Sequence, residues 1–141
     1  MKNLNYPIFY LTSSDIDYKG VLINKNIPKD IPVLVMIQNT GCKYCTLAKP
    51  EYQKLADNYG YYLRNNKPFE KLYQKHKKNI KKELVFVTTV NPKDVDSKIF
   101  KEIDKSFRGY PHFILYYKDK RYTYDGDRTS AALQKFIENK V

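Results

Sequence analysis

The sequence predicts an α/β fold in which a central mixed β-sheet is flanked by helices. Two largely apolar runs, Val33 to Ile37 and Leu84 to Val90, are typical of strands that are covered on both faces. Stretches with apolar residues at helical spacing separate these runs, and two further strands and a final helix follow. The expected order is therefore β-α-β-α-α-β-α-β-β-α. At 141 residues, the chain is long enough for one domain with a core, over residues 1–141, and too short for two of usual size.

The N-terminal part of the chain is the least defined. Tyr6 to Leu11 is apolar and aromatic and predicts a short strand, and Thr12 to Asp15 is a turn or helix-start signal. The segment from Asp15 to Pro32 stays ambiguous, because Val21 to Ile23 fit either a strand or the end of a short helix. A loop bracketed by prolines then leads into the strand from Val33 to Ile37.

Two helices are expected in the middle of the chain. The first begins near Cys42 and continues to about Tyr59, with a kink at Pro50, which lies inside it. The second runs from Pro68, a favoured first helical position, to about Lys82. Its apolar side has helical spacing and consists of Phe69, Leu72, Tyr73, His76 and Ile80. Its other face carries most of seven lysines: Lys67, Lys71, Lys75, Lys77, Lys78, Lys81 and Lys82.

The C-terminal elements follow after short connections. A helix is expected from about Val95 to Phe107, and it buries Ile99, Phe100, Ile103 and Phe107. Strands from His112 to Tyr117 and from Arg121 to Tyr124 are separated by a turn. After a second turn, Asp127 is expected to cap a last helix from Arg128 to Lys140. The inner face of this helix consists of Ala132, Leu133, Phe136 and Ile137.

The only two cysteines of the chain, Cys42 and Cys45, lie two residues apart where the apolar strand gives way to a helix. A thiol at a helix N-terminus meets unpaired backbone N–H groups and the positive end of the helix dipole. Both favour the thiolate, and only the thiolate attacks a disulfide. Cys45 lies one turn further in, where it can attack the mixed disulfide and release the product. The spacing therefore suits dithiol–disulfide exchange.

Two other uses of this cysteine pair have less support. A structural zinc site needs four ligands, but a second CxxC is absent and the spacing of His76 and His112 matches no finger pattern. A purely structural disulfide across so small a loop would stabilise little, because the entropy it removes from the unfolded chain grows with loop size. We therefore expect redox-active cysteines, without a metal or another cofactor.

The net charge and the composition of the chain narrow the kinds of partner and the kind of source organism that we expect. The net charge of +11, carried mainly by lysine, fits an acidic partner, nucleic acid or an anionic surface. No recognised nucleic-acid-binding motif accompanies the charge, so nucleic acid is not an expected partner. The bias toward Lys, Asn, Ile and Tyr is typical of an AT-rich genome, such as that of a large DNA virus or a protozoan.

The sequence also carries an expectation about location. No stretch approaches the length of a membrane span, and no secretory signal is visible, which makes the reducing cytoplasm the default compartment. A viral product could instead be packaged in the virion.

Four motifs follow one another along the chain. They are Cys42-Lys43-Tyr44-Cys45, Cys45 to Tyr52 with its helix-kinking Pro50, Arg108-Gly109-Tyr110-Pro111, and Tyr124 to Thr129. Together they resemble the thioredoxin superfamily, and within it the catalytic domains of protein disulfide isomerases. The match covers most of the chain from about Val33 onward and, more loosely, the N-terminal part. The resemblance implies a thioredoxin fold in which the basic helix is an insertion, at about residues 61–83, after the active-site helix.

The resemblance implies a role for each matching residue. Cys42 would be the exposed nucleophile and Cys45 the buried resolving thiol. Pro111 would be cis and pack against the pair, and the backbone of Tyr110 would hydrogen-bond an extended substrate, as in strand addition. Arg128 matches an isomerase arginine that can approach the active site and favour the Cys45 thiolate, although it could equally be a surface residue at a helix start. The substrate-binding set is Gly41, Lys43, Tyr44 and Tyr110.

Several positions depart from the family pattern. Gly41 replaces the usual tryptophan, Met36 replaces the buried acid that relays a proton to or from the resolving cysteine, and Thr89 replaces the usual lysine of the middle strand. His112 is a candidate to serve in place of that acid, or a plain strand side chain. Lys43 adds a positive charge beside the first cysteine, which should lower the pKa of that thiol.

The sequence therefore predicts a thiol–disulfide oxidoreductase that acts on protein thiols or disulfides, with the direction of electron flow open. Its redox partner would be another protein or glutathione. Tyr44 is shared with glutaredoxins, but those carry Thr or Val rather than Tyr110 before the cis-proline, which makes glutathione the less expected partner. One alternative is a redox-inactive binding or structural module, which the departures at Met36 and Gly41 support. The other is a contact between the lysine-rich helix and an acidic or anionic partner.

Overall fold

The computed structural model describes residues 4–5, 7–24, 27, 31–39, 41–59, 85–103 and 109–141. The predicted basic helix from Pro68 to Lys82, and with it the insertion at about 61–83, lies outside the described residues. The same holds for Phe107 and Arg108 and for His76.

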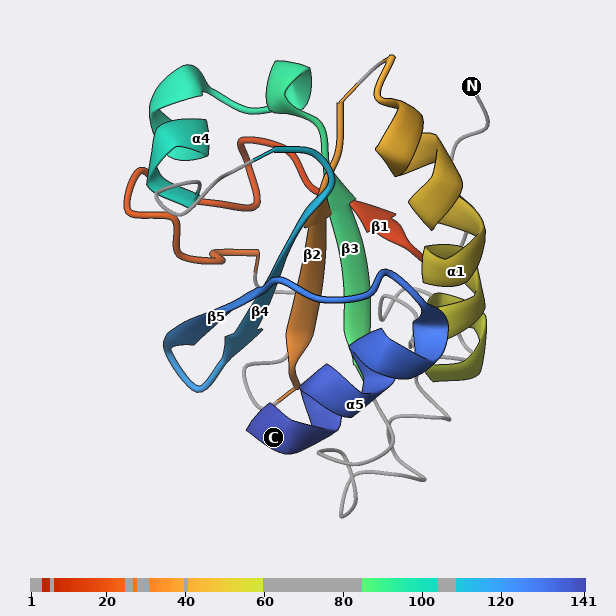
Figure 1. Cartoon of the computed structure of the whole chain (residues 1–141). Coiled ribbons are helices and arrows are strands. Elements are labelled where there is room, and N and C mark those ends of the chain that lie inside the picture. The colour runs from red at the N-terminus through yellow and green to blue at the C-terminus, as the bar shows by residue number, and fades with distance from the viewer. Residues whose placement is uncertain are drawn as a thin grey trace.

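Five strands form one sheet in the order β1-β3-β2-β4-β5 (Figure 1). Their bounds are Phe9–Tyr10 for β1, Val33–Ile37 for β2, Phe86–Val90 for β3, His112–Tyr117 for β4 and Lys120–Tyr124 for β5. β1, β3 and β2 are parallel to one another, whereas β4 is antiparallel to both β2 and β5. The mixed sheet that the sequence predicts is therefore confirmed.

Helices cover both faces of the sheet (Figure 1). The α-helices are α1 (Lys43–Tyr59), α4 (Ser97–Ile103) and α5 (Ser130–Lys140), and a 3₁₀ helix, η2, spans Pro92–Asp94. One core lies between the sheet and α1 with α5, where Leu34, Met36, Phe113 and Leu115 meet Leu55 and Leu133. The other lies on the opposite face, where Val33, Val35, Ile37 and Ile114 meet α4 and the N-terminal segment.

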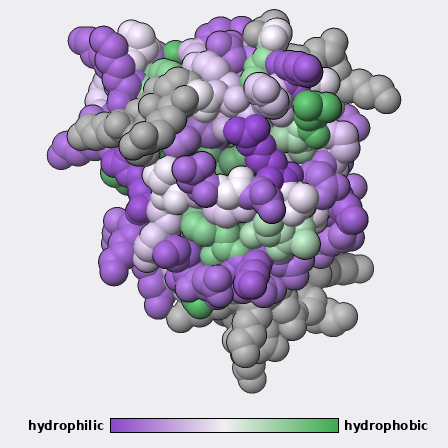
Figure 2. Space-filling view, viewed as in Figure 1, coloured by the Kyte–Doolittle hydropathy of each residue, from purple (hydrophilic) through white to green (hydrophobic). Residues whose placement is uncertain are grey.

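The alternation of side chains along the strands explains this division. In β2, Leu34 and Met36 point to the α1 side while Val35 and Ile37 point to the α4 side, and all are buried. A strand that is apolar at every position can only lie between two cores, which is why the sequence placed it at the centre. Outside these cores, hydrophilic residues cover most of the visible surface, with smaller hydrophobic areas between them (Figure 2).

The register of the central strands brings three chain segments to one edge of the sheet. Ile37, the last residue of β2, pairs with Val90 at the end of β3 and with His112 at the start of β4. The segment that leaves β2 and the segment that enters β4 therefore meet at this edge. Cys42 follows the first segment and Pro111 belongs to the second.

The structure differs from the predictions at several element ends. β1 has two residues rather than the expected six, and Ile16 and Leu22 form an isolated antiparallel bridge within the ambiguous segment. Thr129, not Asp127, caps the last helix, because its side chain accepts a hydrogen bond from the Ala132 N–H at 3.2 Å.

The carbonyl oxygen of Asp127 instead accepts a hydrogen bond from the Tyr124 hydroxyl, within the preceding turn.

In the parts of the chain that the structure describes, no helix is both long and apolar enough to cross a membrane.

Candidate active site

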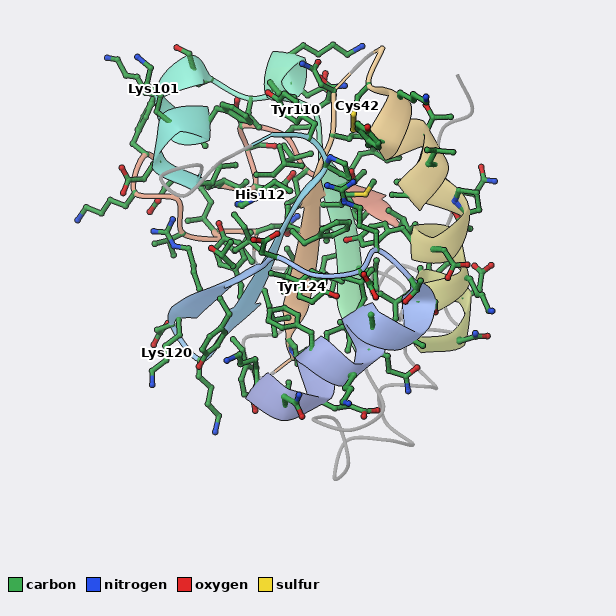
Figure 3. All side chains as sticks on the ribbon, viewed as in Figure 1. Cys42, Lys101, Tyr110, His112, Lys120 and Tyr124 are labelled. Atoms are coloured by element: carbon green, nitrogen blue, oxygen red, sulfur yellow. A yellow bond between two sulfur atoms is a disulfide. The ribbon has the colours of Figure 1, made fainter. Side chains whose placement is uncertain are left out.

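The two cysteines form a disulfide at the N-terminal end of α1, with their Cα atoms 5.2 Å apart (Figure 3). Cys42 directly precedes the helix and is half-buried, whereas Cys45 lies in its first turn and is 0% exposed. The backbone N–H of Cys45 donates a hydrogen bond to Cys42 Sγ at 3.0 Å. This is one of the helix-start N–H groups with no partner inside the helix, and it stabilises negative charge on that sulfur when the pair is reduced.

Gly41 makes the turn that delivers Cys42 to the helix. Its φ is +77°, in the left-handed region that favours glycine. A Cβ built at this position would meet no heavy atom within 4 Å, so the requirement is one of backbone conformation rather than of space. The absence of a side chain also leaves the surface beside Cys42 open.

The peptide bond between Tyr110 and Pro111 is cis, the isomer that the family resemblance implies. Pro111 is buried at the entry to β4, and Tyr110 is half-buried and packs against the core on the α4 side. Figure 3 shows Tyr110 at the same end of the sheet as Cys42. The structure thus brings the proline loop and the cysteine pair to one edge of the sheet.

Arg128 lies at the same site, in the segment before α5. Its guanidinium carbon is 5.7 Å from the centroid of the Tyr44 ring, a cation–π arrangement. Lys43 and Tyr44, the two residues between the cysteines, are both exposed, and 58% of the Tyr44 surface remains accessible. This contact places Arg128 beside the dipeptide between the cysteines, and its role toward Cys45 stays a prediction.

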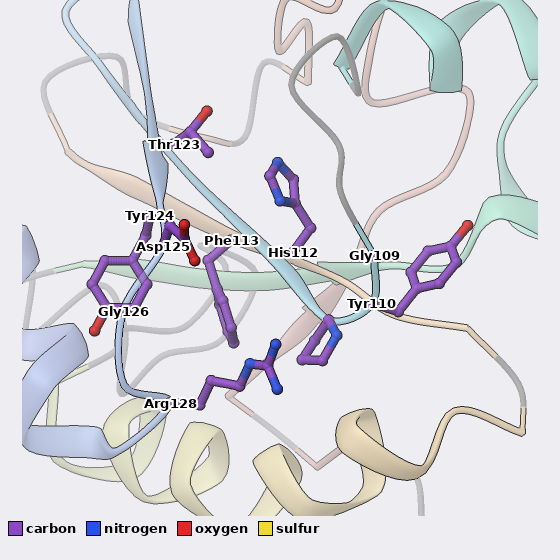
Figure 4. A pocket seen from close by; sticks show the side chains of 10 residues that line it. Gly109, Tyr110, His112, Phe113, Thr123, Tyr124, Asp125, Gly126 and Arg128 are labelled. Carbon is purple, nitrogen blue, oxygen red and sulfur yellow. The ribbon is translucent and has the colours of Figure 1, made fainter.

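A cleft of about 430 Å³ lies behind the proline loop. Its lining includes residues 109–113 from the loop and β4, residues 123–126 from the end of β5, and Arg128. In Figure 4 the Arg128 side chain extends toward the loop that carries Gly109 and Tyr110, while the His112 ring points away from Arg128. Burial lowers the pKa of His112 and the Asp125 carboxylate opposes this shift, so the imidazole is neutral at neutral pH.

The place of the family's buried acid is taken by an apolar side chain and a neutral hydrogen-bond network. Met36 is 0% exposed in the core under α1 and pairs in register with Thr89. The Thr89 hydroxyl donates to the Met36 carbonyl at 2.8 Å and accepts from the Gln38 amide at 2.9 Å. These three residues offer no group that titrates near neutral pH.

Sequence reasoning missed two buried polar residues near the cysteines. Gln38 is 3% exposed and belongs to the network just described, and Lys49 is 7% exposed on α1. Helical spacing contained a signal for the second, because Lys49 follows Cys45 by four residues and so lies on the same face of the helix. For Gln38 no such signal existed, since its partner Thr89 comes from a distant part of the sequence.

A metal site is not formed by the described residues, in which no group of three or more His, Cys, Asp or Glu side chains could hold an ion.

The sequence matches no protein-family model. It is 30% identical over 130 residues to a thioredoxin-like protein, 453L, of Invertebrate iridescent virus 6. The aligned region covers 89% of this chain and 86% of the viral protein.

Several solved structures are similar in fold. The first thioredoxin domain of mouse protein disulfide-isomerase A4 has a TM-score of 0.60 at 20% identity, with 97% of this chain and 77% of that one covered. Human ERp44 has a TM-score of 0.62 at 16% identity, with 99% of this chain and 30% of that one covered. The first two thioredoxin domains of Eps1p from Naumovozyma dairenensis give 0.58 at 19% identity, with 96% and 41% covered. The chain therefore spans less than half the length of the last two, and these likenesses concern the fold.

Proposed function

The chain belongs to the thioredoxin-like proteins, and from this premise we propose that it is a thiol–disulfide oxidoreductase acting on the cysteines of other proteins. One observation carries the proposal: the Cys42–Cys45 disulfide lies at a helix N-terminus, with Cys42 half-buried and Cys45 fully enclosed. The enclosed sulfur cannot reach a folded client directly. It is well placed, however, to attack a mixed disulfide formed on its neighbour.

In the reducing direction, the Cys42 thiolate attacks one sulfur of a client disulfide. The client S–S bond breaks, a mixed disulfide forms, and the other client sulfur leaves as a thiolate. Cys45 then attacks Cys42 Sγ, so that the bond to the client breaks and the intramolecular disulfide forms. Two electrons have passed from the cysteine pair to the client. In the oxidising direction the same steps run in reverse, and a redox partner, either a protein or glutathione, restores the starting state.

The surroundings of the pair support an extended client. The backbone of Tyr110 can pair with such a segment beside Pro111, and the absence of a side chain at Gly41 leaves room next to Cys42. Lys43 and Tyr44 would contact the client from the helix start. Arg128, which already lies over Tyr44, would favour the thiolate of Cys45 by its charge.

Trapping experiments test this proposal. A Cys45→Ser variant should accumulate mixed disulfides with client proteins, because the resolving step is lost, whereas Cys42→Ser should accumulate none. The wild-type protein should reduce insulin with turnover well above a Cys42→Ser/Cys45→Ser control. Equal trapping by both single variants, or turnover at the level of the double variant, would favour the second candidate, a redox-inactive binding module, which the buried and apolar Met36 in place of the family's acid supports.

We also propose a viral source for the chain. The AT-type bias of its composition and the viral source of its 30%-identical relative both support this.

A further inference from the structure

The resolving step needs a group that accepts the proton of the Cys45 thiol. Cys45 is 0% exposed, so its thiol cannot pass its proton directly to bulk water, and a thiol must become a thiolate before it attacks. Met36, Gln38 and Thr89 lie at this end of the sheet, and none of them can accept a proton near neutral pH. The proton acceptor must therefore be a residue other than these three.

Lys49 is a basic side chain on the buried face of α1. At 7% exposed, it is the only lysine or arginine among the buried residues that the structure describes. It follows Cys45 by four residues, a spacing at which Cβ atoms in a helix lie about 5–6 Å apart. Long side chains in a helix lean toward its N-terminus, over the residues three and four positions earlier. This lean would carry the stem of Lys49 over the turn that contains Cys45.

We propose that Lys49 is the proton-transfer residue of the resolving step, an assignment that rests on the oxidoreductase function proposed above. The neutral amine takes the proton of the Cys45 thiol and becomes an ammonium. The thiolate attacks Cys42 Sγ, the bond between that sulfur and the client breaks, and the client sulfur leaves as a thiolate that water protonates. Lys49 then returns its proton to solvent, and in the oxidising direction the same transfers run backward.

The electrostatic surroundings of Lys49 suit this role. Burial lowers the pKa of Lys49, which raises the share of neutral amine near pH 7 above that of an exposed lysine. The titratable groups that the described elements bring to this side of α1 include Cys45 and Tyr52 on the helix itself and Tyr10 on β1. Burial raises the pKa of Tyr10 and raises that of Tyr52 further, so that both phenols stay neutral and do not compete for the proton.

Stopped-flow reaction of the reduced protein with one equivalent of Ellman's reagent separates the two cysteines. A first release of thionitrobenzoate reports attack by Cys42, and a second release reports attack by Cys45 on the resulting mixed disulfide. Three variants are compared with the wild type from pH 5 to 10. Lys49→Met keeps the length without the amine, and Lys49→Arg keeps a charge that does not deprotonate. Lys54→Met is a matched control, because Lys54 is exposed on the same helix.

We expect both Lys49 variants to slow the second release at pH 7 by about 100-fold, the usual scale of general acid–base catalysis, and to move its pH midpoint upward. The first release, and the whole profile of Lys54→Met, should match the wild type. An unchanged second release in Lys49→Met, or full recovery in Lys49→Arg, would overturn the assignment while leaving the function intact.

Absence of any first release in the wild type would instead overturn the oxidoreductase function itself. An unchanged first release in each variant, together with an unchanged circular dichroism spectrum, shows that a slower second release does not come from misfolding.

Discussion

Arg128 lies over the aromatic ring of Tyr44, with its guanidinium carbon 5.7 Å from the ring centroid. Arg128 belongs to the segment before α5, and Tyr44 to the dipeptide between the cysteines. The contact therefore joins the start of one helix to the start of another. Both side chains are exposed, and a cation–π contact at an exposed site contributes about 0.5–1 kcal/mol. That is enough to favour a position of Arg128 near the cysteines.

Removing the aromatic ring of Tyr44 should remove the contact that holds Arg128 near the cysteines. We expect Tyr44→Leu to lower the rate of insulin reduction by about two- to fivefold, the factor that corresponds to the strength of the contact. Tyr44→Phe keeps the ring and should keep the rate. A double-mutant cycle with Arg128→Gln measures the coupling, because the two losses should not add. Fully additive losses would show that the two side chains act separately.

The charge of Lys43 should act on the neighbouring thiolate. In a Cys45→Ser background, the rate of Cys42 alkylation by iodoacetamide gives the pH midpoint of thiolate formation. We expect this midpoint to lie below about 8.5, the value of a free cysteine, because the helix start favours the thiolate. Lys43→Glu should raise it, by less than about 0.7 pH unit because both groups are accessible to solvent. Lys54→Glu, further along the same helix, should leave it unchanged.

The backbone at Gly41 gives a stability prediction. Its φ of +77° costs about 1–2 kcal/mol for a residue with a Cβ, and asparagine tolerates this region better than most. Because the space around the position is open, the cost should come from the backbone alone. We expect Gly41→Val to lower the free energy of unfolding in urea by about 1–2 kcal/mol and Gly41→Asn to lower it less. Equal losses would point to a packing effect.

The central strands were predictable because their apolar composition indicates that they are buried. β2 begins and ends where the apolar run does, and β4 matches its predicted bounds. A strand buried on both faces needs apolar residues at successive positions, so local sequence is sufficient there. The N-terminal segment was not predictable, since it is held by partners from elsewhere: the Leu11 N–H donates to the Thr89 carbonyl, and the Asp96 N–H donates to the Ser13 hydroxyl.

The candidate site divides in the same way. The placement of Cys42 and Cys45 at a helix start follows from local sequence alone. The contact between Arg128 and Tyr44 depends on how α5 closes against the sheet, which spacing along the chain does not encode. Lys49 was only partly predictable. Its spacing from Cys45 predicts that both residues lie on the same face of the helix, but the sequence does not predict that a charged residue on this face is buried.

His112 should make the stability of the protein depend on pH. Its pKa in the fold is lowered from about 6.5, mainly by burial and against the influence of Asp125. Between the lowered value and about 6.5 the unfolded chain binds more protons than the fold does, so stability falls as the pH falls through this window. We expect His112→Gln to flatten the change in melting temperature between pH 7 and pH 5.

The carboxylate of Asp125 offers an independent check. Asp125→Asn removes the charge that raises the pKa of His112, so the loss of stability toward acid should become steeper. A shallower slope in this variant would contradict the assignment of the pH dependence to His112.

The hydroxyl of Tyr52 ties α1, the helix that carries the cysteines, to the sheet. Tyr52 is 0% exposed, and its hydroxyl donates a hydrogen bond to the Thr88 carbonyl at 2.6 Å and lies 3.2 Å from the Leu34 carbonyl. Tyr52→Phe leaves these buried carbonyls with one partner fewer, which costs about 1–3 kcal/mol. We expect urea unfolding to show a loss of this size, while Tyr18→Phe, at a side chain that is 65% exposed, should show none. A loss in Tyr52→Phe no greater than in Tyr18→Phe would mean that water replaces the hydroxyl at those carbonyls.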